Sequence, residues 1–310
     1  MYFRVRRMRL LPWYRSRMKE AVISSGLLSL CLPLALLCLA APRARAQPPG
    51  QEDSALQLVK DVVWNEIHEE AADHSRWMYR DAYKSPTRDT VKLVIQTPQA
   101  NLAELIEDHG QPPSAEAHQA DLSHMEQLLD DPGLRAKQRR DEAHDGQQAD
   151  DLMKMLPSAF LWREVSRADG KVTLAYQPNP TFAPPTMSAK VMASMSGTLV
   201  VSEREKRVIS LNGKLMRSVQ FAWGILGHLN AGGTFQIMRE EVAPHIWQIT
   251  QTHVHISGHA LFFKSIGDQE DETTSDYKPV PDDVDGRKAL EMIRDGRLAR
   301  ELGVSLHTGA

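Results

Sequence analysis

Apolar and polar residues alternate along most of the chain from Phe160 to Ile266, and this pattern restricts the possible folds more than any other. Alternation with a period of two is typical of strands that bury one face. The dipeptides Asp169-Gly170, Asn212-Gly213 and Ser257-Gly258 are of the kind that closes tight hairpins. No segment with helical spacing separates these strands, so the region is predicted to form an antiparallel meander.

The flanking segments carry patterns of their own. From Ser54 to Ala71 apolar residues recur at helical spacing, which predicts an amphipathic helix. Strands are predicted at 77–83 and 91–95, where large apolar residues occupy alternate positions. A charged stretch with helical spacing predicts a helical insertion at about 112–157, and a last helix is predicted at about 283–302.

A curved sheet that holds helices against one face buries these elements economically. We therefore predict an α+β fold, in which a strongly curved antiparallel β-sheet forms an open half-barrel with helices on its concave face. The mature chain, residues 47–310, is expected to be a single domain.

The N-terminal segment has the charge order of a secretory signal. Basic residues up to Lys19 precede an almost wholly apolar run from Leu27 to Ala41, and the small-residue triplet Ala44-Arg45-Ala46 follows. We predict cleavage between Ala46 and Gln47 and a periplasmic or secreted mature protein. The apolar run has about 15 residues, whereas a bilayer-spanning helix needs about 20, so a permanent anchor is not expected.

The predicted mature chain is acidic and free of cysteine. The signal holds 9 of the 37 Lys and Arg residues and one of the 40 Asp and Glu residues, which leaves 28 basic against 39 acidic residues and a net charge of −11. This charge disfavours nucleic acids and anionic membrane surfaces as partners. Cys31 and Cys38 both lie in the signal, so the mature chain offers no disulfide and no thiolate. No cofactor is expected.

Two histidines on one predicted strand, His253 and His255, are the sharpest candidates for chemistry. Residues i and i+2 of a strand point to the same face about 7 Å apart, so the pair could share a zinc ion. The hairpin turn predicted at Ser257-Gly258 turns the next histidine away from them. A half-exposed polar strand face is therefore preferred over a metal site, and a bound metal would need His228 or His245 as a third ligand.

An amphipathic N-terminal helix is followed by strands that carry tryptophan and tyrosine. A Pro-rich crossing, Tyr176–Pro180, then leads to a long strand at Val191–Val201 with its hairpin partner. This order, over about residues 54–266, resembles LolA-type lipoprotein carriers and the related RseB-type periplasmic domains. The resemblance implies an open half-barrel. The insertion at about 112–157 departs from the compact carriers, so no functional residue of that family is transferred to this chain.

The resemblance, the export signal and the absence of a catalytic motif favour a non-enzymatic binding or carrier protein. Its ligand would be apolar, such as a lipid or a lipoprotein acyl chain, held in a cavity between sheet and helices. The candidate wall residues are large apolar side chains at alternate strand positions: Trp77, Tyr79, Leu93, Ile95, Trp162, Leu174, Tyr176, Phe221, Trp223, Phe235 and Trp247.

Two other functions remain open. One is a metal-assisted hydrolase that uses His253 and His255. The other is a structural or adaptor domain of the cell envelope, which needs no cavity.

Overall fold

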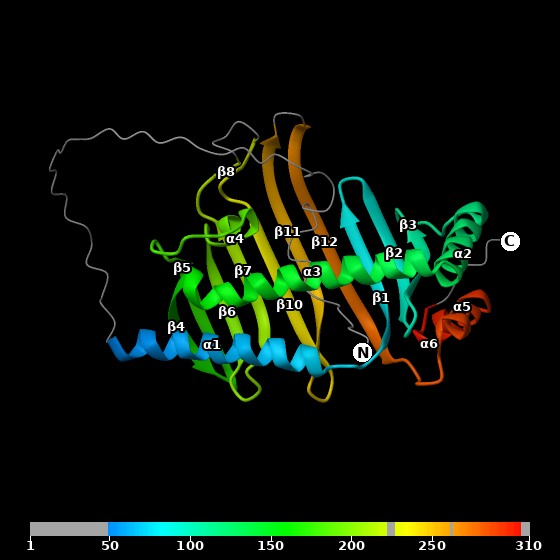
Figure 1. The fold of residues 1–310 in the computed structure, drawn as a ribbon, viewed down its shortest axis with the longest axis horizontal. Coiled ribbons are helices and arrows are strands. Elements are labelled where there is room, and N and C mark those ends of the chain that lie inside the picture. Colours follow the sequence, from blue (N-terminus) through cyan, green and yellow to red (C-terminus); the bar gives the residue numbers. More distant parts are fainter. Residues whose placement is uncertain (1–48, 222–226, 261–262, 305–310) are drawn as a thin grey trace.

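The computed structural model describes residues 49–221, 227–260 and 263–304, and the side chains at 49–52, 221, 259–260 and 263–268 are outside this description. The described strands form one antiparallel sheet flanked by helices (Figure 1), so the predicted α+β class is confirmed. The strands are β1 (Trp77–Ser85), β2 (Arg88–Gln96), β3 (Asn101–Asp108), β4 (Phe160–Ala168), β5 (Lys171–Pro178), β6 (Met195–Ser202), β7 (Val208–Leu215), β8 (Val219–Phe221), β9 (Gly227–Leu229), β10 (Thr234–Ala243), β11 (Ile246–Ala260) and β12 (Phe263–Pro279). The helices are α1 (Pro49–Ala72), α2 (Ala115–Asp130), α3 (Pro132–Ala159), α4 (Met187–Met192), α5 (Gly286–Arg294) and α6 (Arg297–Glu301).

The strand order is β3-β2-β1-β12-β11-β10-β7-β6-β5-β4, and the short β8–β9 pair extends from the end of β11. Most neighbours are consecutive in the chain and joined by short turns, as a meander requires. Two pairings in this order join strands that are not consecutive: β10 pairs with β7, and β12, the last strand, pairs with β1, the first. Two units of strands, β1–β3 and β4–β7, are thereby connected through β10, β11 and β12.

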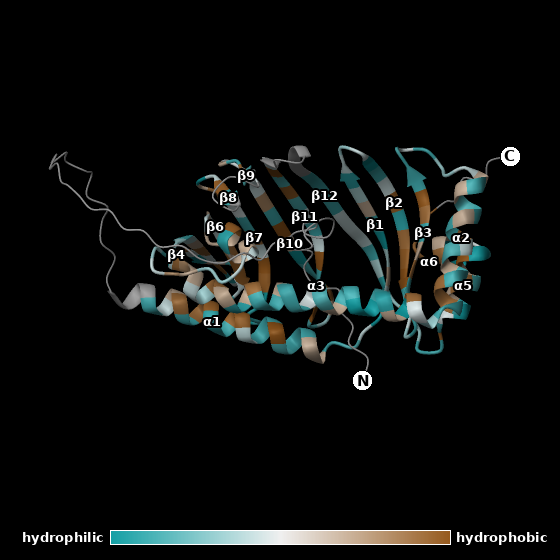
Figure 2. Ribbon diagram, turned by 45° about the horizontal axis from the view of Figure 1, so that its top comes forward, coloured by the Kyte–Doolittle hydropathy of each residue, from teal (hydrophilic) through white to brown (hydrophobic). Residues whose placement is uncertain are grey.

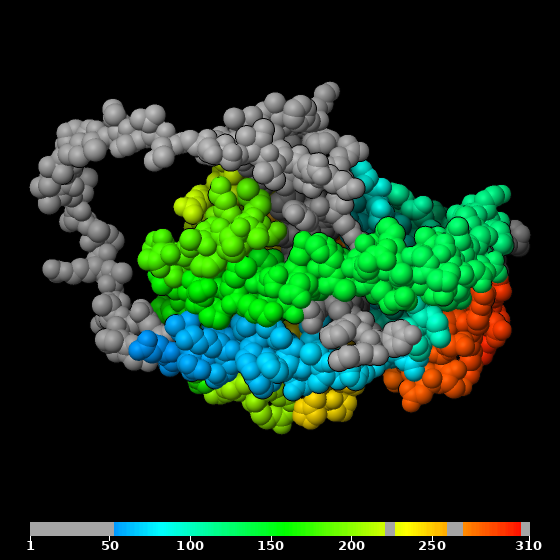
Figure 3. All heavy atoms as spheres, in the orientation of Figure 1, coloured from blue at the N-terminus to red at the C-terminus, as the bar shows by residue number. Residues whose placement is uncertain are grey.

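Helices α1 and α3 lie side by side across one face of the sheet (Figures 1 and 3). Along α1, Ala55, Val59, Val62 and Glu66 form a buried stripe at helical spacing that faces the sheet. At its C-terminal end α3 packs against α1, α4 and β4, and at its N-terminal end it packs against α2. Between these ends α3 crosses the middle of the sheet.

The apolar face of the sheet changes sides along its width. In the β4–β7 unit, side chains such as Leu174 and Tyr176 pack with α1 and α3 in one core. In the β1–β3 unit, Leu93 and Ile95 pack with α2, α5 and α6 in a second core. Because strand residues alternate between faces, the β1–β3 unit turns its other, polar face toward α3.

Two of the three glycine dipeptides do not form turns. Asp169-Gly170 closes the β4–β5 hairpin with positive φ angles of 52° and 69°. Gly213 instead lies inside β7, and Gly258 lies inside β11, which continues to Ala260. A Cβ at Gly213 would collide with Tyr176 and Phe235, and one at Gly258 would collide with the backbone at 228. These glycines therefore permit close approach and do not provide a turn.

A short helix, α4, replaces the start of the long strand predicted from Val191. Thr186 caps α4 by accepting a hydrogen bond from the Ala189 N–H at 3.1 Å, and β6 begins only at Met195. Helices α2 and α3 occupy the region of the predicted insertion. Helices α5 and α6 occupy the region of the predicted last helix and are separated at Gly296, where φ is 68°.

The strong curvature of a half-barrel stays a prediction. The predicted signal and its cleavage site between Ala46 and Gln47 lie outside the described residues.

Candidate binding groove beneath helix α3

Two cavities abut between α3 and the sheet. One has a volume of about 530 Å³ and lies between α3 and strands β1, β2, β11 and β12. The other has a volume of about 410 Å³ and lies between α3, the end of α1 and strands β10 and β11. Both are lined by Gln96, Gln248 and Ile249, so they are neighbouring parts of one space, which we call the α3 groove.

The roof of the α3 groove is the polar underside of α3. Near its C-terminus, Met153 and Leu156 of α3 pack against the core of the β4–β7 unit. Nearer its N-terminus, the α3 residues over the cavity are polar except for Leu134, and they include Gln138, Glu142 and Asp145. Figure 2 shows the same change, with hydrophilic colours along most of the N-terminal part of α3. A helix that only covered a core would present apolar residues throughout.

Local hydrogen bonds fix this roof to the edge of the sheet. The Gln138 side chain accepts from the Asn101 N–H at 3.2 Å and donates to the Asn101 carbonyl at 3.2 Å. The Asn101 side chain donates to Glu142 Oε1 at 3.0 Å. Within the helix, Lys137 pairs with Asp141 at 2.9 Å. The N-terminal half of α3 is therefore held over the strands by polar contacts.

The floor of the α3 groove carries half-buried polar side chains that have no partner among the described residues. Lys92 on β2, Glu272 on β12, and Thr252 and Gln248 on β11 all line the 530 Å³ cavity. None of the four makes a hydrogen bond or an ion pair with the part of the chain that the structure describes. Half-buried polar groups are ordinarily satisfied by protein or solvent, so the groups of this floor are satisfied by water or by a bound polar molecule.

Tyr83 and Arg88 form one wall of the same cavity. Tyr83 donates a hydrogen bond to Glu270 Oε1 at 2.7 Å. Burial and the neighbouring carboxylate raise the pKa of Tyr83 to about 12, so the phenol stays protonated at neutral pH. The guanidinium of Arg88 lies over the Tyr83 ring, 5.4 Å from its centroid.

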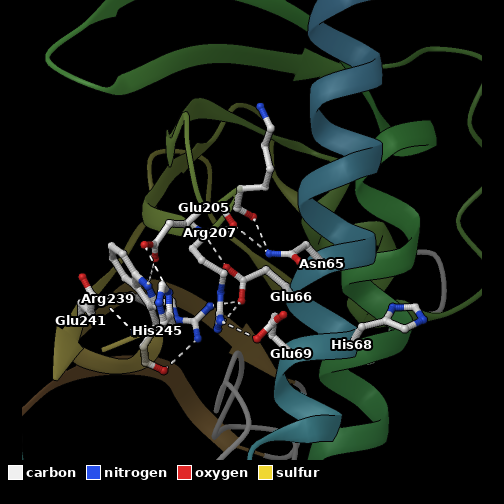
Figure 4. A network of polar contacts seen from close by, with 12 residues as sticks. Asn65, Glu66, His68, Glu69, Glu205, Arg207, Arg239, Glu241 and His245 are labelled. Carbon is white, nitrogen blue, oxygen red and sulfur yellow. Dashed lines mark hydrogen bonds and ion pairs between the residues drawn. The ribbon is translucent and has the colours of Figure 1, made fainter. Parts of the chain in front are cut away.

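A buried ion cluster forms the other end of the α3 groove (Figure 4). Glu66 of α1 is paired with Arg239 of β10 and lies 3.2 Å from Arg207. The Glu66 carboxylate also accepts from the Val208 N–H at 2.5 Å. Arg207 reaches Glu69, one turn further along α1, at 4.0 Å. The cluster joins α1 to the sheet from the inside.

Two cations hold the buried carboxylate of Glu66 in its charged form. Burial alone would raise the pKa of Glu66, but Arg239, Arg207 and the Val208 N–H hold that pKa below its usual value. The Nε atoms of Arg207 and Arg239 are buried and have no hydrogen-bond partner among the described residues. The cluster is thus incompletely satisfied, and Glu66 is the buried anion that balances its two arginines.

Glu205, Glu241 and His245 gather beside this cluster, and their ligand atoms lie within 4.8 Å of one another. Both oxygens of Glu205 are already engaged, one by Trp247 Nε1 at 3.0 Å and the other by Arg204 at 2.8 Å. These two hydrogen bonds lower the pKa of Glu205. Glu205, Glu241 and His245 are thus joined by hydrogen bonds and an ion pair, and these contacts account for their proximity without a metal ion.

A small apolar pocket lies beneath the C-terminal part of α3. Its volume is about 60 Å³, and we call it the aromatic pocket because Phe160, Trp162, Tyr176 and Phe235 line it. It shares Met153 with the 410 Å³ cavity, so it continues the α3 groove toward β4. Burial raises the pKa of Tyr176, whose hydroxyl donates to the carbonyl at 212 at 2.8 Å.

The structure distributes the predicted wall residues among several places. The aromatic pocket contains Trp162, Tyr176 and Phe235, and the α3 groove contains Trp77, Tyr79 and Trp247. Three others lie in the two cores and line neither space: Leu93, Ile95 and Leu174. Trp223 and the side chain of Phe221 lie outside the described residues. Leu93 and Ile95 face the opposite side of the sheet because the apolar face changes sides between β4–β7 and β1–β3.

His253 and His255 lie on the face of β11 that points away from α3, since Val254 between them belongs to the core beneath the helices. Both contact one carboxylate oxygen of Asp271 on β12, at 2.6 Å and 3.0 Å. These hydrogen bonds help to keep the pKa of Asp271 low despite its partial burial, which acts in the opposite direction. An acidic side chain of the neighbouring strand therefore lies within hydrogen-bond distance of both histidines.

The proposed third ligands are not beside this pair. His245 lies in the turn between β10 and β11, at the other end of β11. His228 of β9 pairs with position 259, beyond His255 along β11. Among the described residues, the group whose ligand atoms all converge within 4.8 Å does not include His253 or His255.

Sequence reasoning missed the polar residues of the α3 groove and the ion cluster. One signal was available: Glu66 continues the apolar stripe of α1, and a charge in such a stripe needs buried partners. Lys92 also alternates with apolar residues on β2 and reads as solvent-facing, because nothing local shows that α3 covers that face.

Comparison of the chain with protein-family models, with curated proteins and with solved structures gives no match. None of the helices in the described part of the chain combines the length and apolar character that a membrane crossing requires.

Proposed function

We propose that this protein is an exported, non-enzymatic binding protein that holds a polar ligand in the α3 groove. One observation carries the proposal. The N-terminal part of α3 turns a polar underside toward a polar strand face, and about 530 Å³ of space separates them. A helix on a sheet normally excludes water from apolar side chains, so a polar, hollow interface favours ligand binding over packing.

The surroundings of the groove support this function. The volume lies in the range of small-molecule sites, about 300 to 1,000 Å³. Lys92, Thr252, Gln248 and Glu272 are hydrogen-bonding side chains without partners in the described residues. The secretory signal supports export, and the lack of a catalytic motif in the sequence favours binding over catalysis.

Native mass spectrometry of the untagged mature protein tests the proposal. We expect a non-covalent adduct on the wild type that is lost in Thr252→Trp, because the indole fills the floor of the cavity. The matched control is Thr234→Trp, which changes an exposed residue of β10 outside the groove and should retain the adduct. A wild type without adduct, or an adduct that survives Thr252→Trp, would contradict the proposal.

A second candidate is the apolar carrier expected from the sequence, and the aromatic pocket favours it. Its lining is aromatic, aliphatic and methionine side chains. A volume of about 60 Å³ holds only a few carbon atoms, so a whole acyl chain would require α3 to move outward. Burial of a chain is worth about 25 cal/mol per Å², enough for micromolar binding without a charged contact.

Titration with a fluorescent fatty acid tests the apolar carrier. Met192→Asp places a charge in the aromatic pocket and should weaken saturable binding strongly. Met216→Asp changes a side chain that is 57% exposed and should have no effect. The absence of saturable binding to the wild type would remove this candidate and leave the polar ligand.

A further inference from the structure

We infer that the ligand of the α3 groove is a zwitterionic short peptide, whose carboxylate pairs with Lys92 and whose ammonium pairs with Glu272. This inference rests on the proposed function and adds the chemical class of the ligand. It is carried by the positions of these two charges, by their lack of partners and by the spacing between them.

The two charges lie on either side of β1 on the face toward α3. In the register of the sheet, Lys92 on β2 is opposite Asp81 on β1, and Glu272 on β12 is opposite Tyr83. Asp81 and Tyr83 are two residues apart and share a face. The floor therefore presents a cation on one side of β1 and an anion on the other, and both line the 530 Å³ cavity.

Both charges are unpaired among the described residues, while two cations of β1, the strand between them, are paired. Arg80 of β1 pairs with Glu107 at 3.6 Å, and Lys84 pairs with Asp89 at 3.3 Å. Lys92 and Glu272 are half-buried and have no ion pair or hydrogen bond within the described residues. Partial burial of a charge costs solvation energy, which a ligand of opposite charge offsets.

The spacing of the charges selects the length of the ligand. Neighbouring strands lie about 4.8 Å apart and each residue rises about 3.4 Å, so the Cα atoms of Lys92 and Glu272 are on the order of 12 Å apart. An extended peptide spans about 3.3 to 3.6 Å per residue, so three or four residues bridge this distance.

Polar groups on β11, the strand next to Glu272 on the side away from Lys92, suit peptide bonds. Thr252 is directly opposite Glu272 on β11, and Gln248 lies further along the same strand toward the 410 Å³ cavity. A hydroxyl and an amide can donate to peptide carbonyls and accept from peptide N–H groups. Both are without partners in the described part of the chain.

Isothermal titration of the mature protein with tri-alanine tests the inference. Lys92→Met and Glu272→Gln should each weaken binding about 10-fold or more, as loss of a charge-assisted contact does. Lys84→Met is the matched control: this exposed lysine of β1 already pairs with Asp89, so binding should not change. Thermal unfolding of each variant shows that the fold is retained.

Peptides with one blocked end test the ammonium and the carboxylate of the ligand separately, first on the wild type and then on the two variants. On the wild type, N-acetyl-tri-alanine lacks the ammonium and tri-alanine amide lacks the carboxylate, so both should bind about 10-fold or more weakly. Glu272→Gln should not weaken the acetylated peptide further, and Lys92→Met should not weaken the amide further. This crossed pattern assigns each end of the peptide to its side chain.

Several results would overturn the inference. Equal binding of the zwitterionic and blocked peptides, or equal binding by wild type and both variants, would show that the two charges do not recognise the ligand. Saturable binding of O-phosphoethanolamine in place of tri-alanine would assign a smaller zwitterion and refute the peptide. If tri-alanine fails to bind while Thr252→Trp still removes the native adduct, the peptide falls and the binding function stands. If tri-alanine fails to bind and Thr252→Trp does not remove the native adduct, both the peptide and the proposed binding function are refuted.

Discussion

Replacing Glu104 with glutamine is expected to stabilise the protein at neutral pH. Glu104 lies on β3 with 2% of its surface exposed, and its Oε2 atom has no hydrogen-bond partner in the described residues. Burial, and to a smaller extent the nearby Asp121 carboxylate, raise the pKa of Glu104 from 4.5 to about 7. The fold therefore prefers this side chain protonated.

The sign and size of the effect follow from that pKa. A carboxyl with a raised pKa binds its proton more tightly in the folded state. Its contribution is most favourable below pH 4.5, declines as the pH rises, and is least favourable above about pH 7. At about 1.4 kcal/mol per pKa unit, the loss is about 3 kcal/mol, and Glu104→Gln removes it because the amide does not ionise.

Urea unfolding followed by far-UV circular dichroism measures this difference at pH 4 and pH 8. Glu104→Gln should exceed the wild type by up to about 3 kcal/mol at pH 8 and match it at pH 4. The control Glu107→Gln changes a half-exposed carboxylate of the same strand and should stay within about 0.5 kcal/mol at both pH values. A gain that is absent at pH 8, or equal at both pH values, would refute the reasoning.

Glu66→Gln should destabilise the protein by about 3 to 5 kcal/mol in urea unfolding at pH 7, because it leaves two buried arginines without their anion. A loss no larger than that of the half-exposed Glu69→Gln would contradict this. Because the pKa of Glu66 is lowered by folding, its contribution should be lost as the pH falls below 4.5. N-terminal sequencing of the exported protein should begin at Gln47, and a retained apolar segment would mean an anchored chain. Elemental analysis of untagged protein should find no stoichiometric zinc at His253 and His255, whereas one zinc per chain that is lost when both are changed to alanine would favour the hydrolase.

The spacing of apolar residues along the sequence correctly predicted those helices and strands that bury one apolar face against a neighbouring layer. The stripe of α1 and the alternation of β5, with Leu174 and Tyr176, are periodic because each element meets one core. The pattern failed for β12, whose described side chains are largely acidic and polar from Gln269 to Ser275. This strand is fixed by its partners β1 and β11, so its own residues need not carry an apolar face.

The candidate site was predicted only in part. Trp162, Tyr176 and Phe235 were expected to meet, and they line the aromatic pocket. The polar floor was missed because Lys92 and Glu272 are far apart in the sequence, and β1 brings them together only when β12 pairs with it. Charged residues at alternate positions look like a solvated face until a helix is placed over them.

The sequence alone determined the class of structure, because periodicity and turn chemistry are properties of neighbouring residues. It identified the amphipathic α1, the β4–β5 hairpin at Asp169-Gly170 and an antiparallel sheet. Only the tertiary structure decided which face of each strand is covered. Alternation defines the two faces of a strand but does not say which face is covered. The covering partner comes from a distant part of the chain: α3 covers Lys92, and Glu66 of α1 pairs with Arg239.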